Sequence, residues 1–247
     1  MTSTLRLVIR ECVGRVLDGL PKMLPPDEVH VWHWQPACPP PEITDLWRIL
    51  AEDERQRAQR YHFSKHRDEF VVNRARMRSL LAAYATASSE QLVFEYSPHG
   101  KPSLHDGGGL RFNLSHTQGR AALAVVQERE IGIDVEQIRP QCDARQIAER
   151  FFSAQERQSL QGLSGDVLDQ AFFRGWTRKE AYIKAKGEGL SIPLHEFDVS
   201  LVEGQPALLL STRPDAEEAS RWDLFDLSLG SGYAAALAVA RVPSALA

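Results

Sequence analysis

The chain has 247 residues, of which 43% are hydrophobic and 25% charged, so it suits one large or two small domains and has an ordinary globular composition. A formal net charge of −4 argues against duplex nucleic acid as the main partner. We find no convincing signal peptide and no apolar run that could span a membrane. The three cysteines form no C-x-x-C pair, which argues against disulfides or zinc and favours a reducing cytoplasm.

The N-terminal part of the chain predicts one strand followed by two helices. Alternating apolar residues indicate the strand, and apolar residues at helical spacing indicate the helices, the first with Thr44 as a possible N-cap. The segment before the strand fits either a short helix or a loosely packed arm. In chain order, these elements are expected over residues 7–20, 29–35, 44–61 and 66–87.

Both predicted helices are dense in arginine, and Arg57 and Arg67 are examples. A solvated helix face often has this composition, which is the simpler interpretation. Guanidinium groups also match phosphate oxygens in geometry, so such a surface would suit a phosphate-rich ligand.

The middle of the chain changes to short strands separated by turns, including a polar turn that starts at Ser115. In the last of these strands, Asp134 and Glu136 point to the same face because side chains alternate across a strand. Gly132 lies on that face too and leaves room for a close approach. Such an acidic pair is most often only the polar face of an edge strand. The strands are expected over residues 91–96, 110–114, 121–126 and 131–138.

The second half predicts helices and then strands, as the first half does. Ser153 and Glu156 have the spacing of a capping box. The repeated order of elements predicts an α+β fold with two similar lobes, residues 1–128 and 129–247. Helices are expected over residues 143–152, 153–163 and 166–185, and strands over residues 197–202, 207–210, 222–227 and 233–240.

The last of these helices contains the stretch on which the functional argument depends. It places Trp176, Glu180 and Lys184 one above another on a single face, and Gly187 and Gly189 are plausible ends. A glutamate one turn before a lysine is most often a stabilising surface pair. A functional interpretation therefore needs a second acidic cluster, which the strand over residues 131–138 supplies.

Four segments in order carry a resemblance to a known family: Gly100-Lys101-Pro102, Phe112-Asn113-Leu114-Ser115-His116, Gly132-Ile133-Asp134-Val135-Glu136 and Trp176-x-x-Lys179-Glu180-Ala181-x-x-Lys184. Together they closely resemble the 4′-phosphopantetheinyl transferases of the surfactin-synthetase activator type. The resemblance implies a pseudo-dimer of two similar α+β lobes in one chain. It also implies that the 4′-phosphopantetheine arm of coenzyme A moves to a serine of an apo acyl- or peptidyl-carrier protein, with 3′,5′-ADP as the other product.

The resemblance further implies roles for individual residues. Mg²⁺ is expected at Asp134, Glu136 and Glu180, whose hard oxygen ligands are those that this ion prefers. The expected catalytic residues are Glu180, Lys184 and His116. Apart from the resemblance, the net acidic charge favours carrier docking at a local patch around residues 151–152 and 184–190, and core packing of Phe151, Phe152 and Leu190 is the equally weighted alternative. Contacts to coenzyme A are expected from Arg57, Arg67, Lys101, Pro102, Ser115, His116, Lys179 and Lys184.

Two other functions are alternatives to this interpretation. A metal-dependent nucleotide pyrophosphohydrolase would need these carboxylates and lysines but no carrier protein. A carrier-binding module without activity would not need them, so the intact acidic set argues against it. We also expect a cytoplasmic monomer with no membrane partner.

Overall fold

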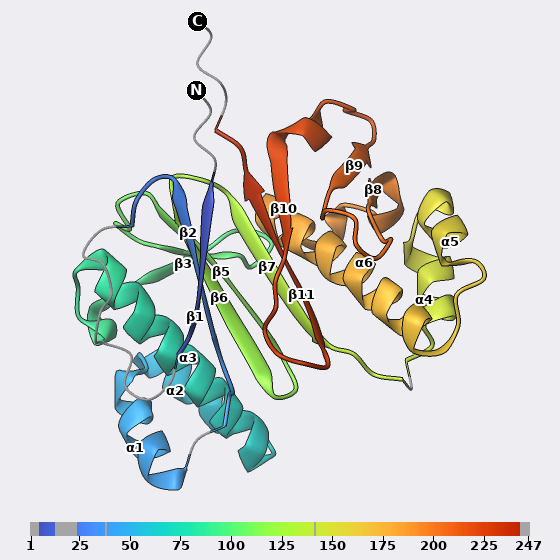
Figure 1. The fold of residues 1–247 in the computed structure, drawn as a ribbon. Helices are drawn as coiled ribbons and strands as arrows, with labels where there is room; N and C mark the ends of the chain where they lie inside the picture. The colour runs from blue at the N-terminus through green and yellow to red at the C-terminus, as the bar shows by residue number, and fades with distance from the viewer. Residues whose placement is uncertain (1–4, 13–23, 38, 141, 243–247) are drawn as a thin grey trace, which may run out of the picture.

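The computed structural model describes residues 5–12, 24–37, 39–140 and 142–242, and it has the mixed α+β fold that the sequence predicts (Figure 1). Two main sheets, each covered by a long helix, form its body. Within the described ranges, no helix combines the length and the apolar character needed to cross a membrane.

The first half of the chain forms a four-stranded sheet covered by α3 (Ser64–Ala85). The order is β1-β2-β6-β5; β1 pairs with β2 in parallel, and the other neighbours pair antiparallel. Met77, Leu80 and Leu81 of α3 pack on this sheet. The other elements of this half are β1 (Arg6–Glu11), β2 (Glu28–Trp34), α1 (Pro40–Ile49), α2 (Glu52–Gln59), β3 (Phe94–Tyr96), β4 (Pro102–Leu104), β5 (Leu110–Thr117) and β6 (Arg120–Gln127).

The second half forms an antiparallel sheet, β10-β11-β7, covered by α6 (Gly165–Lys186). Each half therefore lays a 22-residue helix on its main sheet. The capping box is confirmed, because Ser153 and Glu156 bind each other's backbone N–H. The other elements are β7 (Ile131–Gln137), α4 (Ala144–Phe151), α5 (Ala154–Leu160), β8 (Phe197–Val199), β9 (Leu209–Thr212), β10 (Trp222–Asp226) and β11 (Tyr233–Ala240).

The two main sheets pack face to face. Alternate residues of β2 and β6, such as Val31 and Ala124, share one apolar cluster with Ile133 of β7 and Leu237 of β11. The residues between them point the other way, toward α3 or α6. The layers are therefore helix, sheet, sheet and helix, and Figure 1 shows α3 and α6 on the outer sides.

The single helix expected over residues 44–61 was wrong, since two helices occupy this segment. α1 begins before Thr44, so Thr44 is not its N-cap, and the chain leaves the helix at Leu50. Glu54 accepts a hydrogen bond from the Ala51 N–H at 2.9 Å and caps α2. Because the Ala51 N–H is bound to this side chain, it does not continue the backbone hydrogen bonds of α1. The spacing of apolar residues did not reveal this cap.

One strand was not expected from the sequence, and another extends further than predicted. Residues 7–11, where a helix or an arm was expected, form part of β1, while residues 13–20 lie outside the described residues. β5 continues past Ser115 to Thr117 because these residues keep pairing with β6, so the turn comes later, at residues 118–119.

The close approach expected at Gly132 is confirmed. A Cβ atom at this position would lie 2.1 Å from the carbonyl oxygen of Ala181 and 2.3 Å from the nitrogen of Ala185. The backbone of α6 therefore rests directly on β7, which only glycine permits.

Gly132→Ala should lower the free energy of unfolding by roughly 3 kcal/mol, because the added methyl group collides with helix backbone that has no room to move. Urea denaturation measures the loss. Gly204→Ala is the matched control, since its φ of +77° is strained but its surroundings are open, and it should lose only about 1 kcal/mol. Equal losses in the two variants would contradict the packing argument.

Candidate active site

Strand β7 and helix α6 bring three carboxylates together. Asp134 and Glu136 share the face of β7 that carries Gly132, against which α6 packs. Glu180 and Lys184 directly precede Ala181 and Ala185, the two residues of α6 that contact Gly132, so both lie at this contact. The charges of Asp134, Glu136 and Lys184 all act on Glu180, which places the four groups in one cluster.

The edge of β7 that faces β5 is bound by side chains, and we call these contacts the side-chain ladder. Three alternate residues of β5 accept hydrogen bonds from three alternate backbone N–H groups of β7. The bonds run from Ile133 to Asn113 Oδ1 (2.9 Å), from Val135 to Ser115 Oγ (3.4 Å) and from Gln137 to Thr117 Oγ1 (3.4 Å). The ladder joins the two halves and sets hydroxyl groups beside the carboxylates of β7.

Asp134 is buried at the centre of the cluster. Its Oδ1 accepts hydrogen bonds from Ser115 Oγ at 2.9 Å and from Lys184 Nζ at 2.5 Å. Its Oδ2 is buried too and has no hydrogen-bond partner among the described residues. A buried carboxylate oxygen left in this way is costly, so this atom marks the place where a ligand would bind.

The cluster shifts the pKa of two of its carboxyl groups upward. Burial, then the charge of Asp134, raises the pKa of Glu180 to about 7, although Lys184 opposes the shift. Burial and Asp134 also raise the pKa of Glu136 above its usual value, against a hydrogen bond from Thr117. Mutual repulsion of this kind is relieved by a proton or by a cation.

The donor set fits a hard divalent cation. Within the described ranges, no three acidic, histidine or cysteine side chains form a complete metal site by themselves. Asp134 nevertheless offers a buried oxygen that no described residue binds, and its charge acts on both Glu136 and Glu180. Phosphate and water oxygens commonly complete a Mg²⁺ site that has few protein ligands.

Ser115 and His116 point to opposite faces of β5. Ser115 is buried against Asp134, so a direct contact to phosphate would require this hydroxyl to change partners. His116 is exposed, and partial desolvation followed by the Lys184 charge lowers its pKa below the usual range. Its ring is therefore neutral at pH 7 and lies within the field of the cluster.

Lys101 and Pro102 line a pocket of about 450 Å³ at the C-terminal end of α6. Lys101 Nζ donates to the carbonyl oxygen of Ala185 and to Glu130 Oε2, both at 2.7 Å. Lys101 therefore also binds the end of the helix that carries Lys184. The pocket is further lined by Tyr96, Arg111 and Lys186, which add an aromatic ring and two cations.

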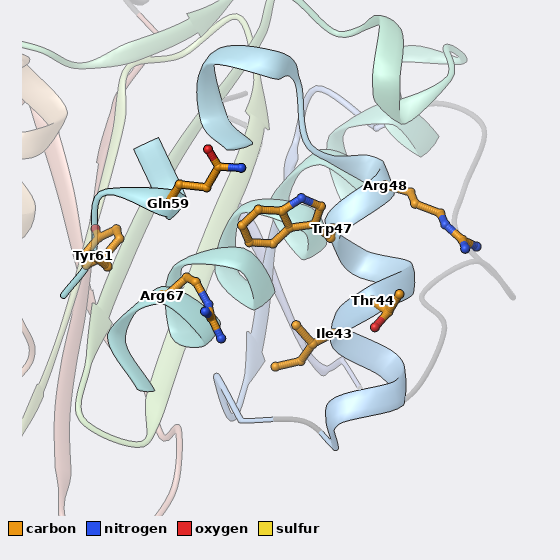
Figure 2. Close-up of a pocket in the computed structure, with 7 residues that line it drawn as sticks. All are labelled: Ile43, Thr44, Trp47, Arg48, Gln59, Tyr61 and Arg67. Atoms are coloured by element: carbon orange, nitrogen blue, oxygen red, sulfur yellow. The ribbon is translucent and has the colours of Figure 1, made fainter. Parts of the chain in front are cut away.

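Arg57 and Arg67 lie elsewhere, on α2 and α3. Arg67 lines a different pocket, of about 530 Å³, together with Ile43, Trp47 and Tyr61 (Figure 2), and none of the three carboxylates lines it. Arg57 is exposed, with its guanidinium 5.3 Å from the centre of the Phe70 ring. The structure therefore does not bring these arginines to the carboxylate cluster.

Much of the remaining arginine density has a structural explanation. Arg74 and Arg78 of α3 both bind the buried carboxylate of Glu54. Arg76 donates to the carbonyl oxygen of Cys12 at 2.8 Å. These three arginines bind partners within the first half of the chain. They therefore do not form part of a continuous phosphate-binding surface.

Lys179 is a correction to the expected coenzyme A contacts. Its side chain is fully buried, with Nζ 2.8 Å from Glu156 Oε1 and 2.6 Å from the carbonyl oxygens of Leu194 and Phe197. It binds none of the three carboxylates of the cluster and instead fastens α6 to α5 and to the start of β8. The sequence motif contains both Lys179 and Glu180, and it does not show that the two side chains lie on different faces of α6.

The expected carrier-docking residues are only partly available. Phe152 is buried and stacks on Phe172, so it belongs to the core. Phe151 is partly buried and contacts Trp176 edge-on. Gly187 ends α6 in the left-handed conformation, as expected, and the side chain of Leu190 lies outside the described residues.

Two family descriptions match the chain. The 4′-phosphopantetheinyl transferase superfamily matches residues 130–238, and the family described as 4′-phosphopantetheinyl transferase, N-terminal, matches residues 32–128.

Individual curated proteins match over much of their length. The 4′-phosphopantetheinyl transferase HetI of Nostoc sp. is 40% identical over 217 residues, which is 87% of this chain and 88% of HetI. The 4′-phosphopantetheinyl transferase psf-1 of Bacillus pumilus is 34% identical, over 71% of this chain and 73% of its own. The 4′-phosphopantetheinyl transferase Sfp of Bacillus subtilis is 29% identical, over 66% and 71%.

Lys179→Met should lower the free energy of unfolding by about 3–5 kcal/mol, because it leaves Glu156 charged and unpaired in the core. The folded protein should keep its affinity for coenzyme A, which calorimetry measures. Lys186→Met is the matched control on the same helix, since Lys186 is partly exposed, and it should lose at most about 1 kcal/mol. A stable Lys179 variant with weakened coenzyme A binding would restore the sequence expectation.

Glu180 should make the protein without divalent cations less stable as the pH rises. Its pKa is about 7 when folded and near 4.5 when unfolded, so the folded state holds the extra proton between these values, and stability falls across that window. Glu180→Gln removes this effect and should gain up to about 3 kcal/mol relative to the wild type between pH 5 and 8. Urea denaturation across this range tests it, and parallel stability curves would contradict it.

Proposed function

The chain belongs to the 4′-phosphopantetheinyl transferases, as its four sequence segments predicted, and we propose that it moves the phosphopantetheine arm of coenzyme A to a serine of an apo-carrier protein with Mg²⁺ bound at its carboxylate cluster. The observation that carries this proposal is the buried Oδ2 of Asp134, which has no partner among the described residues, on a carboxylate whose charge acts on Glu136 and Glu180.

Asp134, Glu136 and Glu180 would hold the cation through their carboxylate oxygens. When bound, Mg²⁺ supplies positive charge that neutralises the pyrophosphate and favours its cleavage. Asp134 is fixed by Ser115 and Lys184, so its geometry is prepared before any ligand arrives. This preorganisation is what a transfer between two bound substrates requires.

Glu180 is the residue that takes the proton of the carrier serine, directly or through a water molecule. The serine oxygen bonds to the phosphorus that carries pantetheine, and the bond from that phosphorus to the bridging oxygen breaks. The electron pair of the broken bond stays on the departing 3′,5′-ADP. In the metal-free protein the pKa of Glu180 is about 7. A cation bound at the cluster would lower that pKa, which keeps the carboxylate ionised and able to accept this proton near neutral pH.

Lys184 and the pocket around Lys101 bind the leaving side of coenzyme A in this proposal. The Lys184 ammonium already lies at the cluster and stabilises or protonates the departing phosphate. The pocket next to it offers Tyr96, Lys101 and Arg111 to the nucleotide end. His116, neutral and exposed near Lys184, assists at the phosphates. The distant position of Arg57 and Arg67 makes them weaker candidates than Lys101.

The pyrophosphohydrolase alternative makes a different product. Coenzyme A and Mg²⁺ without a carrier would then give 4′-phosphopantetheine and 3′,5′-ADP, whereas the transferase needs an apo-carrier to release 3′,5′-ADP. Mass spectrometry of several purified apo-carriers, incubated with and without the enzyme, distinguishes the two functions. A carrier mass increase that depends on coenzyme A supports the transferase, and carrier-independent cleavage overturns it. A cytoplasmic, monomeric protein remains our prediction.

Asp134→Ala and Glu180→Ala should each lower transfer by about 10³-fold, because charge that develops on phosphate loses its cation. Glu136→Ala should lose less, since water can replace a partly exposed ligand. Rates of 3′,5′-ADP release with a carrier measure the effect, and circular dichroism checks folding. Glu149→Ala, an exposed glutamate on α4, is the matched control. Near-normal activity of the Asp134 variant would remove the metal assignment.

A further inference from the structure

Thr117 closes the side-chain ladder, and it lies outside the four sequence segments. Its Oγ1 accepts the backbone N–H of Gln137 at 3.4 Å and donates to Glu136 Oε2 at 3.2 Å. One hydroxyl group therefore touches both the edge of β7 and one of the expected cation ligands.

Ser115 makes the same pair of contacts two residues earlier. Its Oγ accepts the N–H of Val135 and donates to Asp134 Oδ1. β5 and β7 share a period of two residues, so successive hydroxyls of β5 meet successive carboxylates of β7. The Thr117 hydroxyl therefore donates to the Glu136 carboxylate in the same way as the Ser115 hydroxyl donates to the Asp134 carboxylate.

Glu136 has a competing partner on its outer side. Arg139 reaches the same Oε2 at 3.9 Å, and its own side chain is 56% exposed. An arginine at this position draws the carboxylate toward solvent, away from Asp134. The shorter bond to Thr117 opposes that movement from the inner side.

We propose that Thr117 is the positioning residue of Glu136, whose hydroxyl holds this carboxylate beside Asp134 in the orientation that a divalent cation needs. The inference rests on the assignment of Glu136 as a cation ligand under the proposed function. It adds a residue that acts on the cation only through Glu136. Hydrogen-bond partners of metal ligands typically influence metal affinity by about 10- to 100-fold.

The test compares Thr117→Val, which keeps the shape but lacks the hydroxyl, with Thr117→Ser, which keeps the hydroxyl. Mn²⁺ serves as the probe, and electron paramagnetic resonance of free Mn²⁺ gives its affinity for the full chain with coenzyme A present. We expect about a tenfold weaker affinity in the valine variant and recovery to near the wild-type value in the serine variant. Thermal melting without metal confirms that both variants fold.

Glu136→Gln supplies the second arm of the test. If Thr117 acts through Glu136, Thr117→Val should cause no further loss of Mn²⁺ affinity in the Glu136→Gln background, because the two changes then affect one interaction. The same loss in both backgrounds, or an unchanged affinity in Thr117→Val alone, overturns the proposal. Wild-type transfer to a carrier is measured separately, so failure of the proposed function is recognised independently of the Mn²⁺ result.

Discussion

The contact between Gly132 and the backbone of α6 sets the distance on which the site depends. With only a hydrogen atom between strand and helix, a side chain as short as Asp134 reaches Lys184 of α6. Other contacts keep the helix there. Lys179 fastens its outer side to Glu156, and Lys101 binds its C-terminal end. The helix is therefore held from several directions, and its position does not depend on a ligand.

The second constraint is electrostatic, since the fold holds three acidic groups together against their repulsion. Burial, followed by the charge of Asp134, raises the pKa values of Glu136 and Glu180, and these shifts express the cost of the arrangement. Lys184 offsets part of it by pairing with Asp134. Without ligands this arrangement lowers the stability of the fold, and it becomes favourable when phosphate and a cation bind. Such a local loss of stability is common at functional sites.

Periodicity in the sequence predicted the strand that carries Asp134 and the helix that carries Glu180, because burial of one face imposes a regular spacing. It also predicted the close approach at Gly132. It could not predict the break after α1, since a buried side chain of α2 provides the cap. Nor could it place Lys179, whose face depends on partners from another part of the chain. The alternation of Asn113, Ser115 and Thr117 was the available signal for the ladder, but the expected turn at Ser115 obscured it.

The contacts that hold the site also bear on how the protein folds. The contacts that form the site join residues far apart in sequence: Lys184 and Asp134 are separated by 50 positions, and Lys101 and Ala185 by 84. Closing such loops lowers the entropy of the chain before the contacts form and compensate for that loss. This slows folding. The second half carries all four groups of the cluster, but Ser115, which binds Asp134, and Lys101, which binds the end of α6, come from the first half. We therefore expect the complete site to form only after the halves dock. A chain stalled between Glu136 and Glu180 would hold two repelling carboxylates without the lysine that moderates them.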